Sequence, residues 1–248
     1  MQYHHVRTIP STHNALKSNP PAIPPKTMLI AREQTAGRGQ RGNSWEAEPG
    51  MNLTFSLYII PVPVPPARQF LISEAFALAF TDLLDDYGIS ATIKWPNDIY
   101  VGDSKICGIL IEHSLTGNRI ERTILSAGLN VNQTRFLSDA PNPTSILLQP
   151  AYAGGNPLDI NLLTSRLAQK IEARLDRHIY GDETPHDQFM QRLYRADNRL
   201  YPFRDNLNGE TVSARISDVA PDGRLTLSLD TGEERSYLFK EVAFILTR

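Results

Sequence analysis

The stretch KWPNDIYVGDSKICGILIE, residues 94–112, folds back on itself at the Gly-Asp pair at 102–103, which suits a two-residue turn between short apolar strands. A second turn, Gly-Asn at 117–118, leads into another strand-like run, residues 122–131. Consecutive strands joined by tight turns pair antiparallel. Successive hairpins therefore predict a mixed, largely antiparallel sheet and not a doubly wound parallel one.

Two long segments of helix-forming residues predict helices that flank this sheet. Residues 67–87 place apolar side chains on one face, and Gly88 follows as a stop. Residues 159–181 have the same spacing behind Asp159, whose carboxylate suits an N-cap. A shorter third helix is expected after Thr184, which precedes a proline.

The pattern changes after residue 200. Short alternating strands follow, separated by Pro-Asp-Gly at 221–223 and Thr-Gly at 231–232. We predict an α+β fold with a mixed, largely antiparallel sheet flanked by helices in residues 1–200. A small SH3-like β-barrel domain is expected to follow in residues 201–248.

The amino-acid composition is typical of a globular protein. Its 248 residues are 41% hydrophobic and carry a formal net charge of −2, so local cations and not global charge would attract an anion. The single Cys107 excludes an intramolecular disulfide and is expected to be buried in its apolar run. The N-terminus lacks a signal-peptide core and no stretch approaches the roughly 20 apolar residues of a membrane span, so we expect a cytoplasmic protein.

The loop EQTAGRGQRGNSW, residues 33–45, combines glycines with Arg38 and Arg41. Glycines let backbone N–H groups approach an anion, and arginine donates in pairs to carboxylate or phosphate. The loop matches neither a P-loop nor a dinucleotide fingerprint, because it lacks Gly-Lys-Ser/Thr and a strand follows it. A mobile surface loop is the alternative, and Trp45 suits either a ligand stack or a structural anchor.

Lys94 and Lys105 lie on strands that the predicted hairpin brings together, so both ammonium groups can meet one anionic centre. Asp98 adds a carboxylate that can bind Mg²⁺ or accept a proton. Solvated strand-edge lysines beside an Asx turn after Pro96 are the alternative interpretation.

Two further segments, PSTHNAL (10–16) and SAGLNVN (126–132), combine small and polar residues that suit either a ligand or a local turn. For the first segment, Ser-Thr at 11–12 as a helix cap is the favoured alternative. Four histidines have no metal-site spacing and are expected at the surface: His4, His5, His178 and His186.

In their order and separation, STHNAL, EQTAGRGQRGNSW, KWPNDIYVGDSKICGILIE and AGLNVN resemble the catalytic core of biotin protein ligases. The resemblance implies a class II synthetase-like fold. It also implies a two-step reaction in which ATP with Mg²⁺ activates biotin to biotinyl-5′-AMP, and a lysine of a biotin carboxyl carrier domain then takes the biotin.

Site roles follow from the same resemblance, position by position. The implied catalytic residues are Lys105, Arg38, Lys94 and Asp98, with Asp98 also the candidate metal ligand. The implied biotin-binding residues are Ser11, Thr12, His13, Gln34, Gly37, Arg38, Gly39, Gln40, Lys105, Gly108, Ser126 and Gly128. The implied ATP-binding residues are Arg41, Trp45, Lys94, Asn97, Lys105 and Asn130. The segment 135–145 falls where the family has a loop that orders over adenine.

Three positions depart from the family pattern. Gln40 stands where arginine is frequent, which predicts weaker retention of the adenylate unless Arg41 substitutes. His13 replaces a common asparagine, which puts one biotin contact in doubt. Ser126 replaces a frequent glycine and narrows the pocket slightly.

The resemblance also implies which partners the protein has, and two alternative functions stay open. Some family members carry an N-terminal winged-helix domain and double as repressors. Because the resemblance begins within the first dozen residues here, we expect a monofunctional ligase without nucleic-acid or membrane partners. Family members often dimerise through sheet edges, and the sequence leaves the oligomeric state open. The alternatives are a lipoate or octanoate protein ligase, which would not need the polar pair at 11–12, and a non-catalytic biotin-binding module, which would not need Lys105.

Overall fold

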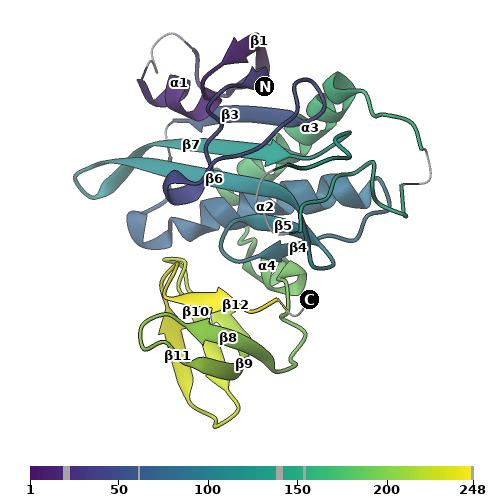
Figure 1. The fold of residues 1–248 in the computed structure, drawn as a ribbon. Helices are drawn as coiled ribbons and strands as arrows, with labels where there is room; N and C mark the ends of the chain where they lie inside the picture. The colour runs from purple at the N-terminus through teal and green to yellow at the C-terminus, as the bar shows by residue number, and fades with distance from the viewer. Residues whose placement is uncertain (19–22, 61, 138–141, 153–154, 247–248) are drawn as a thin grey trace.

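The computed structural model describes residues 1–18, 23–60, 62–137, 142–152 and 155–246, without the side chain of Arg41. Its main layer is a seven-stranded sheet in the order β1-β2-β3-β7-β6-β5-β4 (Figure 1). The strands are β1 (Gln2–Ile9), β2 (Thr27–Gln34), β3 (Leu53–Ile59), β4 (Thr92–Lys94), β5 (Asp98–Val101), β6 (Ser104–Thr116) and β7 (Arg119–Leu129). Only the β1–β2 pair is parallel among these described strands. The predicted mixed, largely antiparallel sheet is confirmed.

Helices cover both faces of the sheet. Helices α2 (Phe70–Asp85) and α3 (Ile160–His178) lie side by side on one face, and α4 (His186–Arg192) packs against α2 (Figure 1). Helix α1 (Thr12–Ser18) packs on the opposite face through Leu16, which meets Leu29 and Tyr58. Within the described residues, no helix is long and apolar enough to cross a membrane.

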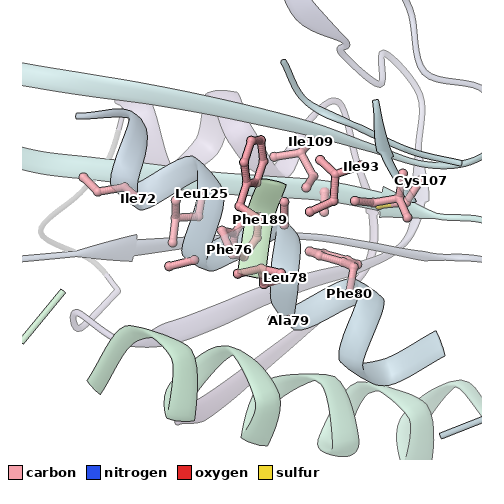
Figure 2. Close-up of a cluster of buried hydrophobic side chains, with 14 of the residues drawn as sticks. Ile72, Phe76, Leu78, Ala79, Phe80, Ile93, Cys107, Ile109, Leu125 and Phe189 are labelled. Carbon is pink, nitrogen blue, oxygen red and sulfur yellow. The ribbon is translucent and has the colours of Figure 1, made fainter. Parts of the chain in front are cut away.

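The main core lies between the sheet and α2. Figure 2 shows Phe76 and Phe80 of α2 among sheet residues, including Ile93 and Leu125. The rings of Phe76 and Phe80 meet edge to face with centroids 5.2 Å apart. Cys107 is fully buried in this layer, as predicted, and burial raises the pKa of its thiol.

Residues after 200 form a second, five-stranded antiparallel sheet in the order β11-β10-β9-β8-β12. Its strands are β8 (Tyr201–Asp205), β9 (Thr211–Val219), β10 (Leu225–Leu229), β11 (Glu234–Tyr237) and β12 (Val242–Phe244). We call residues 201–246 the C-terminal sheet. It lies against the β4 edge of the main sheet, where Trp95 Nε1 donates to Gly223 O at 2.9 Å. The boundary between the two predicted domains stays a prediction.

Local signals in the sequence were accurate. Gly102 has a φ of +54° in its turn, and Gly88 has a φ of +72° where α2 ends. The carboxylate of Asp159 accepts from Asn161 N at 2.8 Å, so the predicted N-cap of α3 is confirmed. The predicted cap of α4 is off by one residue, because Pro185 and not Thr184 is the N-cap, although Thr184 Oγ1 accepts from His186 N at 3.4 Å.

Three expectations need correction. Strand β1 was not predicted, because its mostly exposed residues lack an apolar alternation and its pairing with β2 is long-range. Helix α2 is buried on more than one face, since α3 and α4 cover the side that the sheet does not. His178 is buried and not a surface residue, because its Nδ1 reaches Glu183 O at 2.9 Å and its Nε2 lies 3.2 Å from Arg174.

Candidate active site

A cavity of about 970 Å³ opens on the α1 side of the sheet and extends to the C-terminal sheet. The side chains or backbone of these sequence-predicted residues line it: Ser11, Thr12, His13, Gln34, Arg38, Gly39, Gln40, Trp45, Lys94, Asn97, Asp98, Lys105, Gly108, Ser126, Gly128 and Asn130. Gly37 lies outside the lining, and the side chain of Arg41 is outside the described part of the chain. The fold thus brings four separate sequence segments to one place, which the spacing alone could not establish.

The glycine-rich loop forms a small hairpin over the cavity. Arg38 and Ser44 pair as an antiparallel bridge, and Gly39 N donates to Asn43 O at 2.7 Å. Gly42 turns the tip with a φ of +90°, a conformation that favours glycine. A Cβ on Gly37 would lie 2.6 Å from Trp45 O, so the close return of the loop requires glycine there. Gly37 therefore shapes the loop and does not face the cavity.

Trp45 lies on two glycines of the sheet. Gly108 and Gly128 are direct partners across β6 and β7. A Cβ on Gly128 would lie 2.3 Å from the indole, and one on Gly108 would lie 2.8 Å from it. The indole Nε1 is buried and has no hydrogen-bond partner within the described residues. We call this pair of glycines the glycine platform.

Lys105 and Asp98 form an ion pair beside the platform. Lys105 Nζ lies 2.8 Å from Asp98 Oδ1 and 5.5 Å from the centroid of Trp45, and both charged side chains are mostly buried. The backbone of Lys105 is also held, because its N–H donates to Asn142 O at 2.8 Å and its carbonyl accepts from Thr144 N at 2.9 Å. The lysine is thus fixed at its main chain and its ammonium group.

Lys94 is a second, more enclosed cation. Its ammonium group lies 5.1 Å from the ring centroid of Tyr100 and 5.0 Å from that of Phe244 in the C-terminal sheet. Burial lowers the pKa of Lys94, with Lys105 adding to this effect and Asp98 opposing it. The two lysines and one aspartate leave a net positive charge at this end of the cavity.

Two amides brace the site. Asn97 Nδ2 donates to Ile109 O at 2.6 Å, so this amide links the start of β5 to β6. Asn130 Nδ2 donates to Thr144 O at 2.9 Å, while its buried Oδ1 has no partner among the described residues. Asn130 therefore keeps a free acceptor beside the cavity.

The other end of the cavity is lined by small polar groups. Ser11 begins α1, where its carbonyl accepts from Ala15 N and its hydroxyl from Asn14 N, so the helix-cap interpretation holds. Thr12 N and Thr12 Oγ1 both donate to Gln34 Oε1, at 2.8 and 3.0 Å. Arg38 Nη1 donates to Asn14 Oδ1 at 2.8 Å at the rim. Apart from Arg38 at its rim, the side chains named here are uncharged, and we call this the neutral end of the cavity.

The C-terminal sheet supplies a wall that sequence reasoning missed. Its lining residues are Asn206, Phe239, Lys240, Val242, Ala243 and Phe244. The ring of Phe239 meets that of Trp95 at 6.1 Å, which seats this wall on the main sheet. No motif signals these residues, because their role depends on how two distant segments pack.

The segment predicted to order over a ligand lies partly outside the described residues, which omit 138–141. Its described flanks reach the site: Phe136 and Pro143 line the cavity. Leu137 N donates to Glu46 Oε1 at 2.8 Å, which links this segment to the glycine-rich loop.

The site contains few candidate metal ligands. Across the described residues, no group of three or more His, Cys, Asp or Glu side chains is arranged so that it could hold a metal ion. Asp98 is the carboxylate nearest Lys105, and Mg²⁺ bound with nucleotide phosphates needs only one or two such groups. The donor set therefore fits a metal that arrives with a polyphosphate and not a resident metal.

Comparison with known proteins identifies the family of this chain. Residues 5–131 match the model of the biotin/lipoate A/B protein ligase family. The bifunctional ligase/repressor BirA of Bacillus subtilis is 34% identical over 95% of this chain and 71% of its own length. The biotin–[acetyl-CoA-carboxylase] ligase of Mycobacterium tuberculosis is 34% identical over 82% of this chain and 73% of its own. The BirA of Salmonella typhimurium is 32% identical over 81% of this chain, which spans 61% of that relative's length.

A solved structure shares the fold. The biotin protein ligase from Aquifex aeolicus in complex with biotin and ATP superposes with a TM-score of 0.79 over 99% of both chains, at 19% identity. The match includes the C-terminal sheet, because it covers nearly the whole chain.

Proposed function

Because the chain belongs to the biotin/lipoate A/B protein ligase family, we propose that it is a biotin protein ligase that activates biotin with ATP and transfers it to a carrier lysine. The observation that carries the proposal is the Lys105–Asp98 pair beside the glycine platform, between a cationic end and a hydroxyl-lined end of one cavity. Biotin has matching ends, since a carboxylate and a polar ureido ring are joined by an apolar chain.

In the first step, a biotin carboxylate oxygen attacks the α-phosphorus of ATP, and the bond to the β-phosphate oxygen breaks to release pyrophosphate. The two reactants are both anionic and repel each other in solution. Lys105, Lys94 and Arg38 provide positive charge and N–H donors for these groups, and enclosure strengthens each interaction. Lys105 is proposed to bridge the carboxylate and the α-phosphate.

In the second step, a lysine amine of a biotin carboxyl carrier domain attacks the acyl carbon of biotinyl-5′-AMP. AMP leaves, and the nitrogen gives up a proton as the amide forms. Asp98 is the carboxylate placed to orient this amine or accept its proton, because it already lies within reach of an ammonium group at 2.8 Å. Mg²⁺ would supply charge neutralisation at the phosphates, with Asp98 as the available protein ligand.

The nucleotide is proposed to lie near Trp45, Asn97 and Asn130. Asn130 offers the free Oδ1, whereas the amide nitrogen of Asn97 is already bonded and positions the strand. Gln40 lines the cavity, and we predict that the adenylate is retained less tightly than in family members with arginine at this position, unless Arg41 substitutes. The rate at which adenylate escapes in the absence of a carrier would measure it.

A lipoate or octanoate ligase is the nearest competing activity, because the family model includes it. The hydroxyls of Ser11, Thr12 and Ser126 favour a polar ring over an acyl chain at the neutral end. Transfer of labelled biotin onto a carrier domain, with ATP and Mg²⁺, tests the proposal. Transfer of lipoate or octanoate with none of biotin would overturn it.

A further inference from the structure

A buried chain of hydrogen bonds runs behind the neutral end of the cavity from Gln34 to His13. Thr12 Oγ1 donates to Gln34 Oε1 at 3.0 Å, and Ser56 Oγ lies 2.8 Å from Thr12 Oγ1. Ser126 Oγ is 2.7 Å from Ser56 Oγ and 2.8 Å from His13 Nδ1. We call these five residues the hydroxyl relay. Ser56 is fully buried and outside the cavity lining, so it touches the site only through its neighbours.

Counting protons fixes the direction of the relay. It contains four contacts, and each contact needs one proton between its two atoms. The hydroxyls of Thr12, Ser56 and Ser126 supply one proton each. When all four contacts are hydrogen bonds at once, the fourth proton comes from Nδ1 of His13, which always carries one in the imidazolium form. With that proton in place, every hydroxyl donates toward Gln34, whose Oε1 then accepts from both Thr12 N and Thr12 Oγ1.

The other ring nitrogen of His13, Nε2, faces a second acceptor that competes for the proton of the ring. His13 Nε2 lies 3.2 Å from Glu112 Oε2, and Lys17 Nζ lies 2.8 Å from the same oxygen. A neutral imidazole has one proton and cannot serve both Ser126 and Glu112. Burial lowers the pKa of His13, Glu112 opposes that shift, and Arg38 and Lys17 add to it.

We infer that the neutral ring places its proton on Nε2, because the charged carboxylate of Glu112 attracts the proton more strongly than the neutral hydroxyl of Ser126 does. Nδ1 then accepts from Ser126, and the hydroxyls of Ser56 and Thr12 turn to follow it. Thr12 Oγ1 no longer donates to Gln34, so one lone pair of Gln34 Oε1 becomes free. Gln34 lines the cavity, so we infer that a ligand N–H can donate to this lone pair.

We propose that His13 is a positioning residue that acts through the hydroxyl relay to decide whether Gln34 accepts an N–H group of the ligand. The ligand class is a cyclic urea or amide with an N–H donor at the neutral end. The inference rests on the proposed function, because it assigns the ring of the substrate to this end. The ligand should therefore bind only the protein in which His13 is neutral, and it should not bind the protein in which His13 is an imidazolium.

A measurement without ligand tests the relay itself. Nitrogen-15 NMR of the histidine rings in the unmodified protein reports which ring nitrogen of His13 carries the proton at pH 8. We expect the Nε2–H tautomer. In Ser56→Ala, the hydroxyl of Ser126 loses Ser56 Oγ as an acceptor and can donate only to Nδ1 of His13. This favours the neutral ring, so the pKa of His13 should fall although Ser56 does not contact His13. An Nδ1–H tautomer at pH 8, or an unchanged pKa in Ser56→Ala, would overturn the relay.

Titration calorimetry with biotin between about pH 5 and 8 tests the consequence. Because only the neutral form binds, Kd should rise about tenfold for each pH unit below the pKa of His13. In Ser56→Ala the Kd for biotin should change little over the same pH range. His113→Asn is the matched control: His113 Nδ1 also bonds a strand hydroxyl, Thr123 Oγ1 at 2.8 Å, but lies outside the cavity. It should retain the dependence of the unmodified protein.

The two failures are distinguishable. A protein that shows the expected tautomer but binds no biotin at any pH would refute the proposed function and leave the relay standing. A protein that binds biotin with a Kd independent of pH would refute the role of His13 and leave the ligase proposal intact.

Discussion

Gly108 and Gly128 face each other across β6 and β7, and together they form the surface on which the indole of Trp45 lies. Neither glycine has a positive φ, so backbone conformation does not require glycine at either position. The requirement is space, because a methyl group at either position would overlap the indole.

Gly128→Ala should therefore displace Trp45 while leaving the sheet intact. We expect kcat/KM for biotin-dependent pyrophosphate release to fall about tenfold, which corresponds to the 1–3 kcal/mol that overpacking costs. Tryptophan fluorescence should report the movement. A double-mutant cycle with Trp45→Ala provides the control, because the effect of the added methyl should largely disappear without the indole. Additive effects of the two substitutions would contradict the steric account.

Lys105→Ala should abolish most pyrophosphate release without unfolding the protein. Loss of a charge that stabilises the reacting groups costs on the order of a hundredfold or more in kcat. Lys170→Ala is the control, since Lys170 pairs with Asp86 on the helical side and lies outside the cavity. Circular dichroism and pyrophosphate release should be measured on both variants. Near-normal release from a folded Lys105→Ala protein would remove Lys105 from the mechanism.

Phe244→Leu should weaken ATP binding because Lys94 would lose one of its two aromatic faces. A cation–π contact of about 1 kcal/mol predicts a rise of about fivefold in the KM for ATP. The KM for biotin should stay unchanged. A lower Tm with both KM values unaltered would assign Phe244 to packing alone, through its contact with Phe203 at 5.1 Å.

His186 should stabilise the contact between α2 and the C-terminal sheet in a pH-dependent way. It lies 3.0 Å from the buried Glu74 of α2 and 3.2 Å from Asp218 of β9. Burial lowers the pKa of His186, but the two carboxylates outweigh that effect and the net shift is upward. The stabilisation is thus fully present below about pH 6.5 and is lost as pH rises through the higher pKa of the folded state.

His186→Gln is the variant that isolates this contribution, since burial shifts the pKa values of His13, His113 and His178 in the opposite direction. The Tm difference between the unmodified protein and His186→Gln should be about 2 °C larger at pH 6 than at pH 8, as expected for a partly exposed pair in a chain of this size. A difference independent of pH would exclude an ionised His186 at the junction.

Sequence alone predicted the features that depend on neighbouring residues. The turn at Gly102 and the N-cap at Asp159 follow from local backbone and hydrogen-bond chemistry. The proximity of Lys94, Asp98 and Lys105 was predicted, but the predicted pairing was wrong. The turn at Gly102 pairs β5 with β6, and a second turn pairs β4 with β5, so the strands of Lys94 and Lys105 lie on either side of β5. Their roles stay predictions until variants are assayed.

What the sequence could not predict depends on contacts between distant segments. Strand β1 exists because it pairs with β2, and its own residues carry little strand pattern. The hydroxyl relay joins α1, β2, β3 and β7, so no spacing rule exposes Ser56 as a member. His178 was placed at the surface because helix periodicity does not reveal which side chain a following loop will cover.

The wall formed by Phe239, Lys240 and Phe244 has a consequence for synthesis. These residues leave the ribosome after the main sheet, so the growing chain can fold that sheet before the cavity has its final boundary. A chain interrupted between the two sheets would retain the cavity lining of the main sheet but would lose the ring of Phe244 from Lys94. The enclosure of this lysine is therefore completed only after the C-terminal sheet has been synthesised.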